Sequence, residues 1–266
     1  MIEDDLRPGY VDTPMGRMHV VTRGSGPCLV LLHQTPRCWD EYRALMSRLD
    51  DYQLVVPDLP GHGASPPPVA NTIEGAAEAV LAILDALAVP SAHVAGHHFG
   101  GLVAYHLAVS APERVESLVL SSTPYIDAAE RERRRTAPAF NEVEPRSDGG
   151  HLGELWQRRS GYLARPDPAV LSRYVRDVLA HAEPDRGHAA VAVYRSEDGV
   201  GRYPGPVLRI ESARDPRAFP RRERIKAAFP QARELVIGEG DIATPETCPG
   251  EFAAAIVDFH RGAVHR

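Results

Sequence analysis

Two adjacent histidines stand at a predicted sharp turn between a buried strand and a helix. The segment reads Gly96-His97-His98-Phe99-Gly100, and its glycines leave room for the strained backbone that such a turn requires at its centre. Imidazole is the side chain best suited to exchange a proton near neutral pH, which is the chemistry of a general acid or base. Because a bystander residue would not need to adopt a strained conformation, we interpret His98 as functional.

Short apolar strands alternate with amphipathic helices on either side of this turn. Such alternation implies a mainly parallel sheet that helices cover on both faces. The predicted strands span residues 18–24, 28–33, 52–58, 92–97, 117–122, 206–213 and 233–238. The predicted helices span residues 38–49, 73–87, 99–109, 221–229 and 251–261, with Asn71 or Thr72 as the cap of the second.

The pattern changes between residues 125 and 205. This segment lacks strand signals and carries charged helical stretches at residues 151–159 and 169–182. It is too long for a loop, so we expect a helical lid. The predicted organisation is a core domain built from residues 1–124 and 206–266, with a lid formed by residues 125–205.

The composition limits the partners and the compartment. The chain has 266 residues, 43% of them hydrophobic and 25% charged, with a net charge of −6, so nucleic acid is not the expected partner. The run of residues 131–135 (RERRR) is interpreted as a solvated helix face. No apolar stretch approaches the ~18–20 residues that span a bilayer, and the polar first residues do not resemble a signal peptide. Three cysteines without a C-x-x-C pair favour a reducing, cytoplasmic setting.

Four segments resemble motifs of the α/β-hydrolase superfamily, in the order that this family shows. They are residues 31–42 (LLHQTPRCWDEY), 58–65 (DLPGHGAS), 96–101 (GHHFGG) and 211–216 (ESARDP). The resemblance covers nearly the whole chain. It implies an α/β-hydrolase fold: a mainly parallel eight-stranded sheet with helices on both faces and a helical lid inserted after strand 6.

The resemblance also implies a set of site residues, with two departures from the pattern. Backbone N–H groups of Gln34 or Thr35 and of Phe99 would form the oxyanion hole, and Asp215 matches the acid of the catalytic triad. The triad histidine is missing, because residues 238–242 read GEGDI and place Asp241 or Ile242 there. His98 stands where the family has its nucleophile, so a serine acyl-enzyme mechanism is excluded at this turn.

The two departures can be parts of one rearrangement. An imidazole reaches roughly 3 Å farther than a serine hydroxyl, so the ring of His98 can enter the space of the missing triad histidine. There it would hydrogen-bond Asp215 and restore an Asp–His dyad. A separation too large for a direct or one-water hydrogen bond would refute this hypothesis.

Other residues are weaker candidates for the substrate pocket. His33 is interpreted mainly as a structural residue, Cys38 precedes a helix near the expected pocket mouth, and Tyr125 leaves a strand end directly. The remaining candidates are Asp241 and several lid residues: His151, Trp156, Tyr162, His181 and His188.

These residues predict a cofactor-independent enzyme without a bound metal. His98 would act as general acid/base with a backbone oxyanion hole on a small carbonyl-containing substrate, for elimination, cyclisation or isomerisation, as in natural-product tailoring. One alternative is a hydrolase that activates water through His98 and Asp215. The other is a non-catalytic descendant that binds a small ligand under the lid. We expect a monomer or homodimer that binds neither nucleic acid nor membrane.

Overall fold

An eight-stranded sheet forms the centre of the protein, in the order β1-β2-β4-β3-β5-β6-β7-β8. The computed structural model describes residues 5–181 and 183–263. β1 pairs antiparallel with β2 and β2 with β4, and the remaining neighbours are parallel, which confirms the predicted mainly parallel sheet. The strands are β1 (Arg7–Thr13), β2 (Gly16–Arg23), β3 (Cys28–Leu32), β4 (Gln53–Pro57), β5 (Ala92–His97), β6 (Val115–Ser121), β7 (Val207–Ser212) and β8 (Arg233–Ile237).

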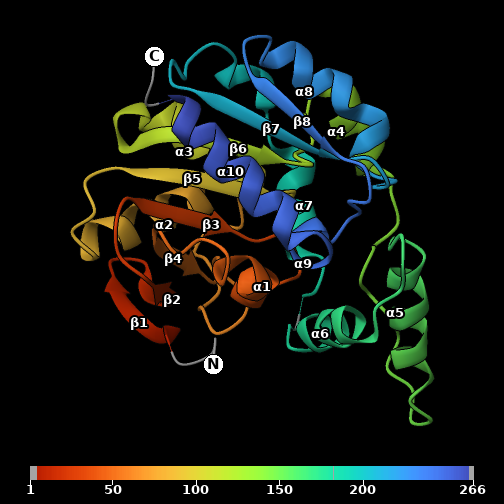
Figure 1. Ribbon diagram of the computed structural model, residues 1–266. Coiled ribbons are helices and arrows are strands. Elements are labelled where there is room, and N and C mark those ends of the chain that lie inside the picture. The colour runs from red at the N-terminus through yellow and green to blue at the C-terminus, as the bar shows by residue number, and fades with distance from the viewer. Residues whose placement is uncertain (1–4, 182, 264–266) are drawn as a thin grey trace.

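Helices cover both faces of this sheet, as Figure 1 shows. On one side lie α2 (Ile73–Ala86), α3 (Phe99–Ser110) and α8 (Arg222–Ala228). On the other lie α1 (Arg43–Met46), α9 (Thr244–Thr247) and α10 (Pro249–Ala263), with α10 crossing the front of the sheet in Figure 1.

The strand residues supply two hydrophobic cores in alternation. Val30 and Val94 belong to the core under α2 and α3, whereas Leu29, Leu31 and Ala95 belong to the core under α1 and α10. All five are fully buried. Successive side chains of a strand point to opposite faces, so a strand that is covered on both faces must be apolar throughout.

Some local predictions need correction and one is confirmed. The predicted helix 38–49 is a 3-10 turn, η2 (Trp39–Tyr42), followed by the short α1. β1 was not delineated from the sequence, because its residues are mostly exposed and carry little apolar alternation. Thr72 does cap α2, since its Oγ1 accepts a hydrogen bond from the N–H of Gly75 at 3.0 Å.

Among the described residues between β6 and β7, within the segment expected to form the lid, there are four α-helices. They are α4 (Ala128–Arg135), α5 (Gly150–Ser160), α6 (Pro168–Leu179) and α7 (Arg186–Val193). Figure 1 shows α5 and α6 standing beside the sheet rather than on either face. No helix among the described residues is long and apolar enough to cross a membrane.

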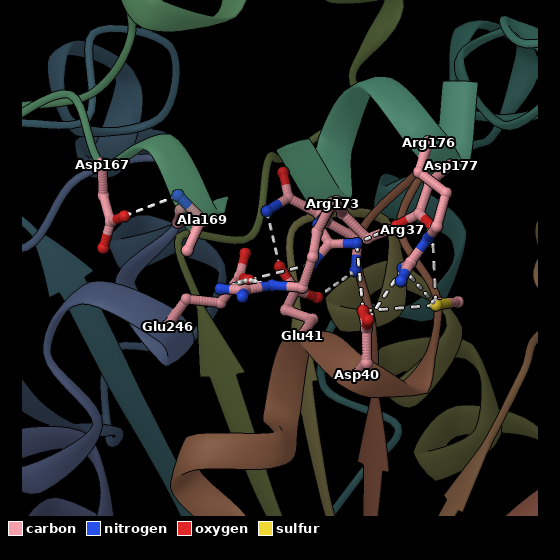
Figure 2. A network of polar contacts seen from close by, with 12 residues as sticks. Arg37, Asp40, Glu41, Asp167, Ala169, Arg173, Arg176, Asp177 and Glu246 are labelled. Atoms are coloured by element: carbon pink, nitrogen blue, oxygen red, sulfur yellow. Dashed lines mark hydrogen bonds and ion pairs between the residues drawn. The ribbon is translucent and has the colours of Figure 1, made fainter. Parts of the chain in front are cut away.

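A buried network of charges attaches α6 to the core (Figure 2). Arg37 follows β3 and is fully buried. It pairs with Asp177 of α6, and its Nη2 lies 2.9 Å from Glu246 Oε1 of α9. Arg173 also pairs with Glu246 at 2.8 Å, and Arg176 pairs with Asp40 at 2.7 Å. Arg37, Asp40, Arg173, Arg176, Asp177 and Glu246 are hereafter called the lid-anchoring network.

Candidate active site

The turn after β5 holds His98 in a strained backbone conformation. Its φ is 47° and its ψ is −108°, which confirms the positive φ expected at the centre of the turn. The neighbouring glycines are required by packing: a Cβ on Gly96 would lie 2.1 Å from the carbonyl oxygen of Gly100, and one on Gly100 would lie 2.0 Å from that of Leu32. The turn thus fixes the position from which the imidazole of His98 extends toward the carboxyl edge of the sheet.

The ring of His98 contacts Asp215, which follows β7. His98 Nε2 lies 2.7 Å from Asp215 Oδ2, within direct hydrogen-bond distance. The other carboxylate oxygen, Oδ1, accepts the backbone N–H groups of Arg217 at 2.7 Å and Ala218 at 2.9 Å. Burial raises the pKa of Asp215, but His98 and these two N–H groups outweigh it and lower the pKa to about 2.

This contact assigns the tautomer of His98. Because Asp215 is a carboxylate and can only accept, Nε2 of His98 carries the proton that it donates. In the neutral ring, Nδ1 then has a free lone pair, and no described residue hydrogen-bonds to it. Nδ1 is therefore the nitrogen that is left to receive a proton.

A cavity of about 710 Å³ lies between the dyad and the lid. The core contributes Gln34, Thr35, His98, Phe99, Pro124, Arg217, Arg221 and Ile242 to its lining. The lid contributes Arg133, Arg134, Ala137, Pro138, Ala139, Phe140, Arg158, Arg159, Tyr162, Asp185, His188, Ala189, Val191 and Ala192. The core residues follow the carboxyl ends of parallel strands, where α/β sheets place their ligands.

Gln34 is not available as an oxyanion-hole donor, which corrects one alternative. Its backbone N–H donates to Glu41 Oε2 at 2.8 Å, and its side-chain Nε2 donates to Glu41 and to the carbonyl of Ile242 at 2.9 Å. Glu41 is fully buried, and burial raises its pKa to about 7. Among the described residues, nothing accepts the N–H groups of Thr35 and Phe99, so these two remain the candidate donors.

Five residues predicted to contact a substrate do not line the cavity: His33, Cys38, Tyr125, Trp156 and Asp241. His33 is the clearest case. Its ring is fully buried, with Nε2 accepting the N–H of Leu59 at 2.9 Å and Nδ1 donating to the carbonyl of Gln34 at 2.8 Å. Burial lowers the pKa of His33 to about 4, so the ring is neutral and both nitrogens are occupied. His33 supports the loop rather than contacting a ligand.

Cys38 is likewise removed from the cavity. Its Sγ lies 3.3 Å from Asp40 Oδ1 and 3.8 Å from Asp177 Oδ1, beside the lid-anchoring network. Burial raises the pKa of its thiol to about 12, so it is a poor nucleophile.

Asp241 has a structural position, whereas the adjacent Ile242 lines the cavity. The carboxylate of Asp241 accepts the N–H of Ala164 at 2.9 Å, the N–H of Ala243 at 2.9 Å and the hydroxyl of Thr247 at 3.1 Å. It joins the lid to the turn before α9 and has no oxygen directed at a substrate.

The other two misplaced predictions concern aromatic residues. Trp156 packs against the lid cluster that contains Leu163 and Leu171, and Tyr125 packs against the core under α3. Of the remaining lid candidates, Tyr162 and His188 line the cavity, whereas His151 and His181 do not. His188 Nδ1 lies 2.8 Å from Asp185 Oδ1, so it already has a partner.

Sequence reasoning missed the arginines of the cavity. Six line it: Arg133, Arg134, Arg158, Arg159, Arg217 and Arg221. Two of them, Arg133 and Arg134, belong to the run at residues 131–135. This run forms a largely exposed helix, as the solvated-face interpretation predicts, but it also contributes to the cavity. The dense arginine content of the lid was the only signal available.

One group of donor atoms among the described residues has the spacing of a metal site, formed by Cys38, Asp40 and Asp177. Arg37 and Arg176 already pair with both carboxylates. Two guanidinium groups within ion-pair distance would repel a cation, so the arrangement fits an ion-pair network and not a metal centre.

Comparisons with known proteins add to this geometry. A family model described as alpha/beta hydrolase fold matches residues 27–241. Over 148 residues, or 52% of this chain, the sequence is 31% identical to "Bifunctional epoxide hydrolase 2" of Mus musculus, of which it covers 27%. Over 150 residues, or 48% of this chain, it is 33% identical to "Lipase LipV" of Mycobacterium tuberculosis, of which it covers 58%.

A solved structure of a hydrolase from Pseudomonas aeruginosa is similar over nearly the whole chain. The TM-score is 0.78 at 27% sequence identity, covering 95% of this chain and 98% of that one. The chain thus spans only 27% and 58% of the length of the two curated relatives named here.

Proposed function

Because the chain belongs to the α/β-hydrolase fold family, as its motifs predicted, we propose that it is an enzyme whose reactive group is the base His98. The observation that carries this proposal is the hydrogen bond of 2.7 Å between His98 Nε2 and Asp215 Oδ2, which leaves Nδ1 free beside the cavity. Asp215 fixes the tautomer of the imidazole and stabilises the imidazolium that forms when Nδ1 takes a proton.

The reaction that best suits this arrangement is deprotonation next to a carbonyl group. His98 Nδ1 removes the proton, and the electron pair of the C–H bond moves onto the carbonyl oxygen as an enolate. The N–H groups of Thr35 and Phe99 stabilise that oxygen. Return of the proton to another carbon gives isomerisation, loss of a leaving group gives elimination, and attack on a second carbonyl gives cyclisation. No cofactor is required for these steps. A role in natural-product tailoring stays a prediction, because no contact in the cavity selects it.

Hydrolysis is the second candidate, and the names of the relatives favour it. Epoxide hydrolases and a lipase are among the proteins that this chain resembles. Here His98 Nδ1 would take a proton from water, which attacks an ester or epoxide directly without a covalent enzyme intermediate.

Two isotope experiments separate these reactions. The protein is incubated in D2O with ketones and esters that carry an acidic C–H, and deuterium incorporation is followed by NMR. Epoxides and p-nitrophenyl esters are incubated in H2(18)O under single-turnover conditions, and the product is analysed by mass spectrometry. Catalysed deuterium exchange supports the first reaction. Catalysed hydrolysis supports the second, and ¹⁸O in the diol formed from an epoxide in a single turnover shows direct attack by water, whereas an ester gives labelled acid by either route.

Variants then test the base. His98→Ala should lower the rate by about 10²–10⁴-fold, the usual contribution of a general base. His106→Gln is the matched control, because His106 lies on α3, contacts Tyr194 at 3.2 Å and does not line the cavity. A His98→Ala protein with the wild-type rate, or a serine that fluorophosphonates label with loss of activity, would refute the proposal. A folded protein that binds ligands but fails both assays would indicate the non-catalytic alternative.

A further inference from the structure

A buried arginine of the lid has no partner for its charge. Arg159 lies on α5, is 2% exposed and lines the same cavity as His98. Its Nε and Nη2 are buried without a hydrogen-bond partner, and among the described residues no carboxylate lies within ion-pair distance of its guanidinium. Its contact with the ring of Tyr174, at 4.8 Å from the centroid, satisfies no N–H group.

Nearby carboxylates do not form an ion pair with Arg159. Glu246 pairs with Arg37 and Arg173 through Oε1, and its Oε2 is buried without a hydrogen-bond partner but not within ion-pair distance of Arg159. Glu41 accepts both hydrogen bonds from Gln34. Burial lowers the pKa of Arg159, in keeping with an uncompensated cation. Buried charges in proteins are normally paired, so an unpaired one that lines a cavity is an exception that calls for a ligand.

Most of the other charged side chains that line the cavity are also cations. Arg133 and Arg134 share the single carboxylate of Glu130, and Arg158 pairs with Glu154. Asp185, the one carboxylate of the lining, is engaged by His188 and by Asn141.

Besides Arg159, two arginines of the lining have no carboxylate partner among the described residues. Arg217 lies over the rings of Phe140 and Tyr162, at 4.6 Å and 4.9 Å from their centroids, and donates to the hydroxyl of Tyr162 at 2.8 Å. Arg221 donates to the carbonyl of Arg217 at 2.8 Å. The cavity therefore carries excess positive charge.

We propose that the substrate is a monocarboxylate with an apolar or aromatic body, and that Arg159 binds its carboxylate. This inference rests on the proposed function, because it places the substrate in the cavity of His98. A guanidinium offers parallel N–H donors that match the two oxygens of a carboxylate. Phe99, Phe140 and Ile242 supply apolar surface for the remainder of the molecule. Of the three arginines without a carboxylate partner, Arg159 is buried whereas Arg217 and Arg221 are exposed. One buried guanidinium balances one negative charge, which favours a carboxylate over a phosphate dianion.

Ligand binding tests this independently of turnover. Benzoate, phenylacetate, 4-phenylbutyrate and hexanoate are compared with their carboxamides and with phenyl phosphate, by thermal shift and by calorimetry. We expect the carboxylates with the best fit to raise the melting temperature and the amides to have no effect. Arg159→Met should bind these carboxylates at least about tenfold more weakly, as expected for the loss of a charge-assisted hydrogen bond.

The same variant distinguishes a ligand-binding arginine from a structural one. Without ligand, Arg159→Met should melt at a higher temperature than the wild type, because it replaces an unpaired buried charge by an apolar side chain of similar length. Arg165→Met is the matched control: Arg165 is an exposed lid arginine whose nearest carboxylate, on Glu239, lies 3.5 Å away. We expect this control to bind carboxylates as the wild type does.

The outcomes separate this inference from the proposed function. His98→Ala should still bind the carboxylates, so a variant that binds them without turnover supports both ideas. Failure of every carboxylate to bind, equal binding of the amides, stronger binding of phenyl phosphate or wild-type affinity in Arg159→Met would each overturn the carboxylate site. None of these results would affect the assignment of His98 as a base, which the exchange experiments test.

Discussion

His98 and Asp215 are 117 residues apart in the chain and extend from strands that are not neighbours, yet their side chains meet at 2.7 Å. β6 lies between β5 and β7, so a residue as short as serine at position 98 would not be expected to bridge the gap. The imidazole spans it because its Nε2 lies several ångströms from the backbone. The carboxylate therefore keeps an imidazole as its partner even though residues 238–242 contain no histidine.

Replacing Asp215 by Asn should reverse the tautomer of His98. One amide oxygen cannot serve both the N–H groups of Arg217 and Ala218 and the ring of His98. We expect the oxygen to keep the two backbone donors and the amide NH2 to face Nε2. Nε2 then becomes an acceptor, and Nδ1 carries the proton. The rate should fall by about 10²–10⁴-fold, and ¹⁵N shifts of the ring should show the exchanged tautomer.

The same substitution should change the response to acid. The folded pKa of Asp215 is about 2, below the ~3.9 of an unfolded Asp, so the unfolded state binds the proton more readily. Its contribution, of order 2 kcal/mol, is present above pH ~4 and is lost as the pH falls toward 2. Asp127→Asn is the control, because Asp127 caps α4 and Asn caps equally well. Unfolding by urea between pH 2 and 6 measures this contribution. A control whose acid dependence of stability changes as much as that of Asp215→Asn would contradict the assignment.

A second pH dependence should come from His33. Its folded pKa is about 4 and that of an unfolded histidine is ~6.5, so between these values the unfolded state holds more protons. Stability is therefore complete above pH ~6.5 and falls as the pH drops toward 4, by up to ~1.4 kcal/mol per pH unit for one proton. His33→Gln, in which the side-chain oxygen can still accept the N–H of Leu59, should reduce this slope by about one proton in urea unfolding. Parallel slopes would show that His33 does not titrate in this way.

The sequence could predict those features that depend on local patterns. The alternating strands and helices, the glycines around His98 and the Thr72 cap each follow from residues a few positions apart. The contact between His98 and Asp215 could also be anticipated, because the carboxyl ends of parallel strands meet at one edge.

Other features of the site could not be predicted, because they depend on contacts between residues that the sequence pattern does not relate. The N–H of Gln34 is taken by Glu41 because the intervening chain folds back on itself. Asp241 is occupied by Ala164, a lid residue distant in sequence. Arg159 stands four residues after Leu155, on the buried face of α5, and nothing in the spacing shows that a charged residue there lines a cavity.

The lid-anchoring network should be essential for stability. Arg37→Met would remove a fully buried cation from Asp177 and Glu246, although Arg176 still pairs with Asp177 and Arg173 with Glu246. We expect a cost of about 1–3 kcal/mol, that of a lost partner to a buried polar group. Hydrogen exchange of α6 should increase along with a lower urea midpoint. Arg165→Met removes a cation from an exposed position and should change stability by less than about 0.5 kcal/mol. Equal effects of the two variants would mean that the network does not hold the lid.

We expect that two substitutions can create a reactive serine at position 98. His98→Ser alone should not react with fluorophosphonates, because no imidazole would then stand between the new hydroxyl and Asp215. Ile242 lines the same cavity and occupies one of the two positions at which the family's triad histidine is expected. The double variant His98→Ser with Ile242→His should therefore place the imidazole between the hydroxyl and Asp215, and it should be labelled faster than either single variant.

Asp241→His in the His98→Ser background serves as the comparison, because the side chain at position 241 is directed at Ala164 and Thr247 rather than the cavity. Labelling is measured by mass spectrometry of the peptide that contains residue 98. Labelling of the His98→Ser single variant at the rate of the double variant would show that another group activates the hydroxyl. Preferential labelling with histidine at position 241 would show that the triad position was misassigned. Labelling only with histidine at 242 would support the view that the base moved from the end of β8 to the end of β5 while its acid stayed in place.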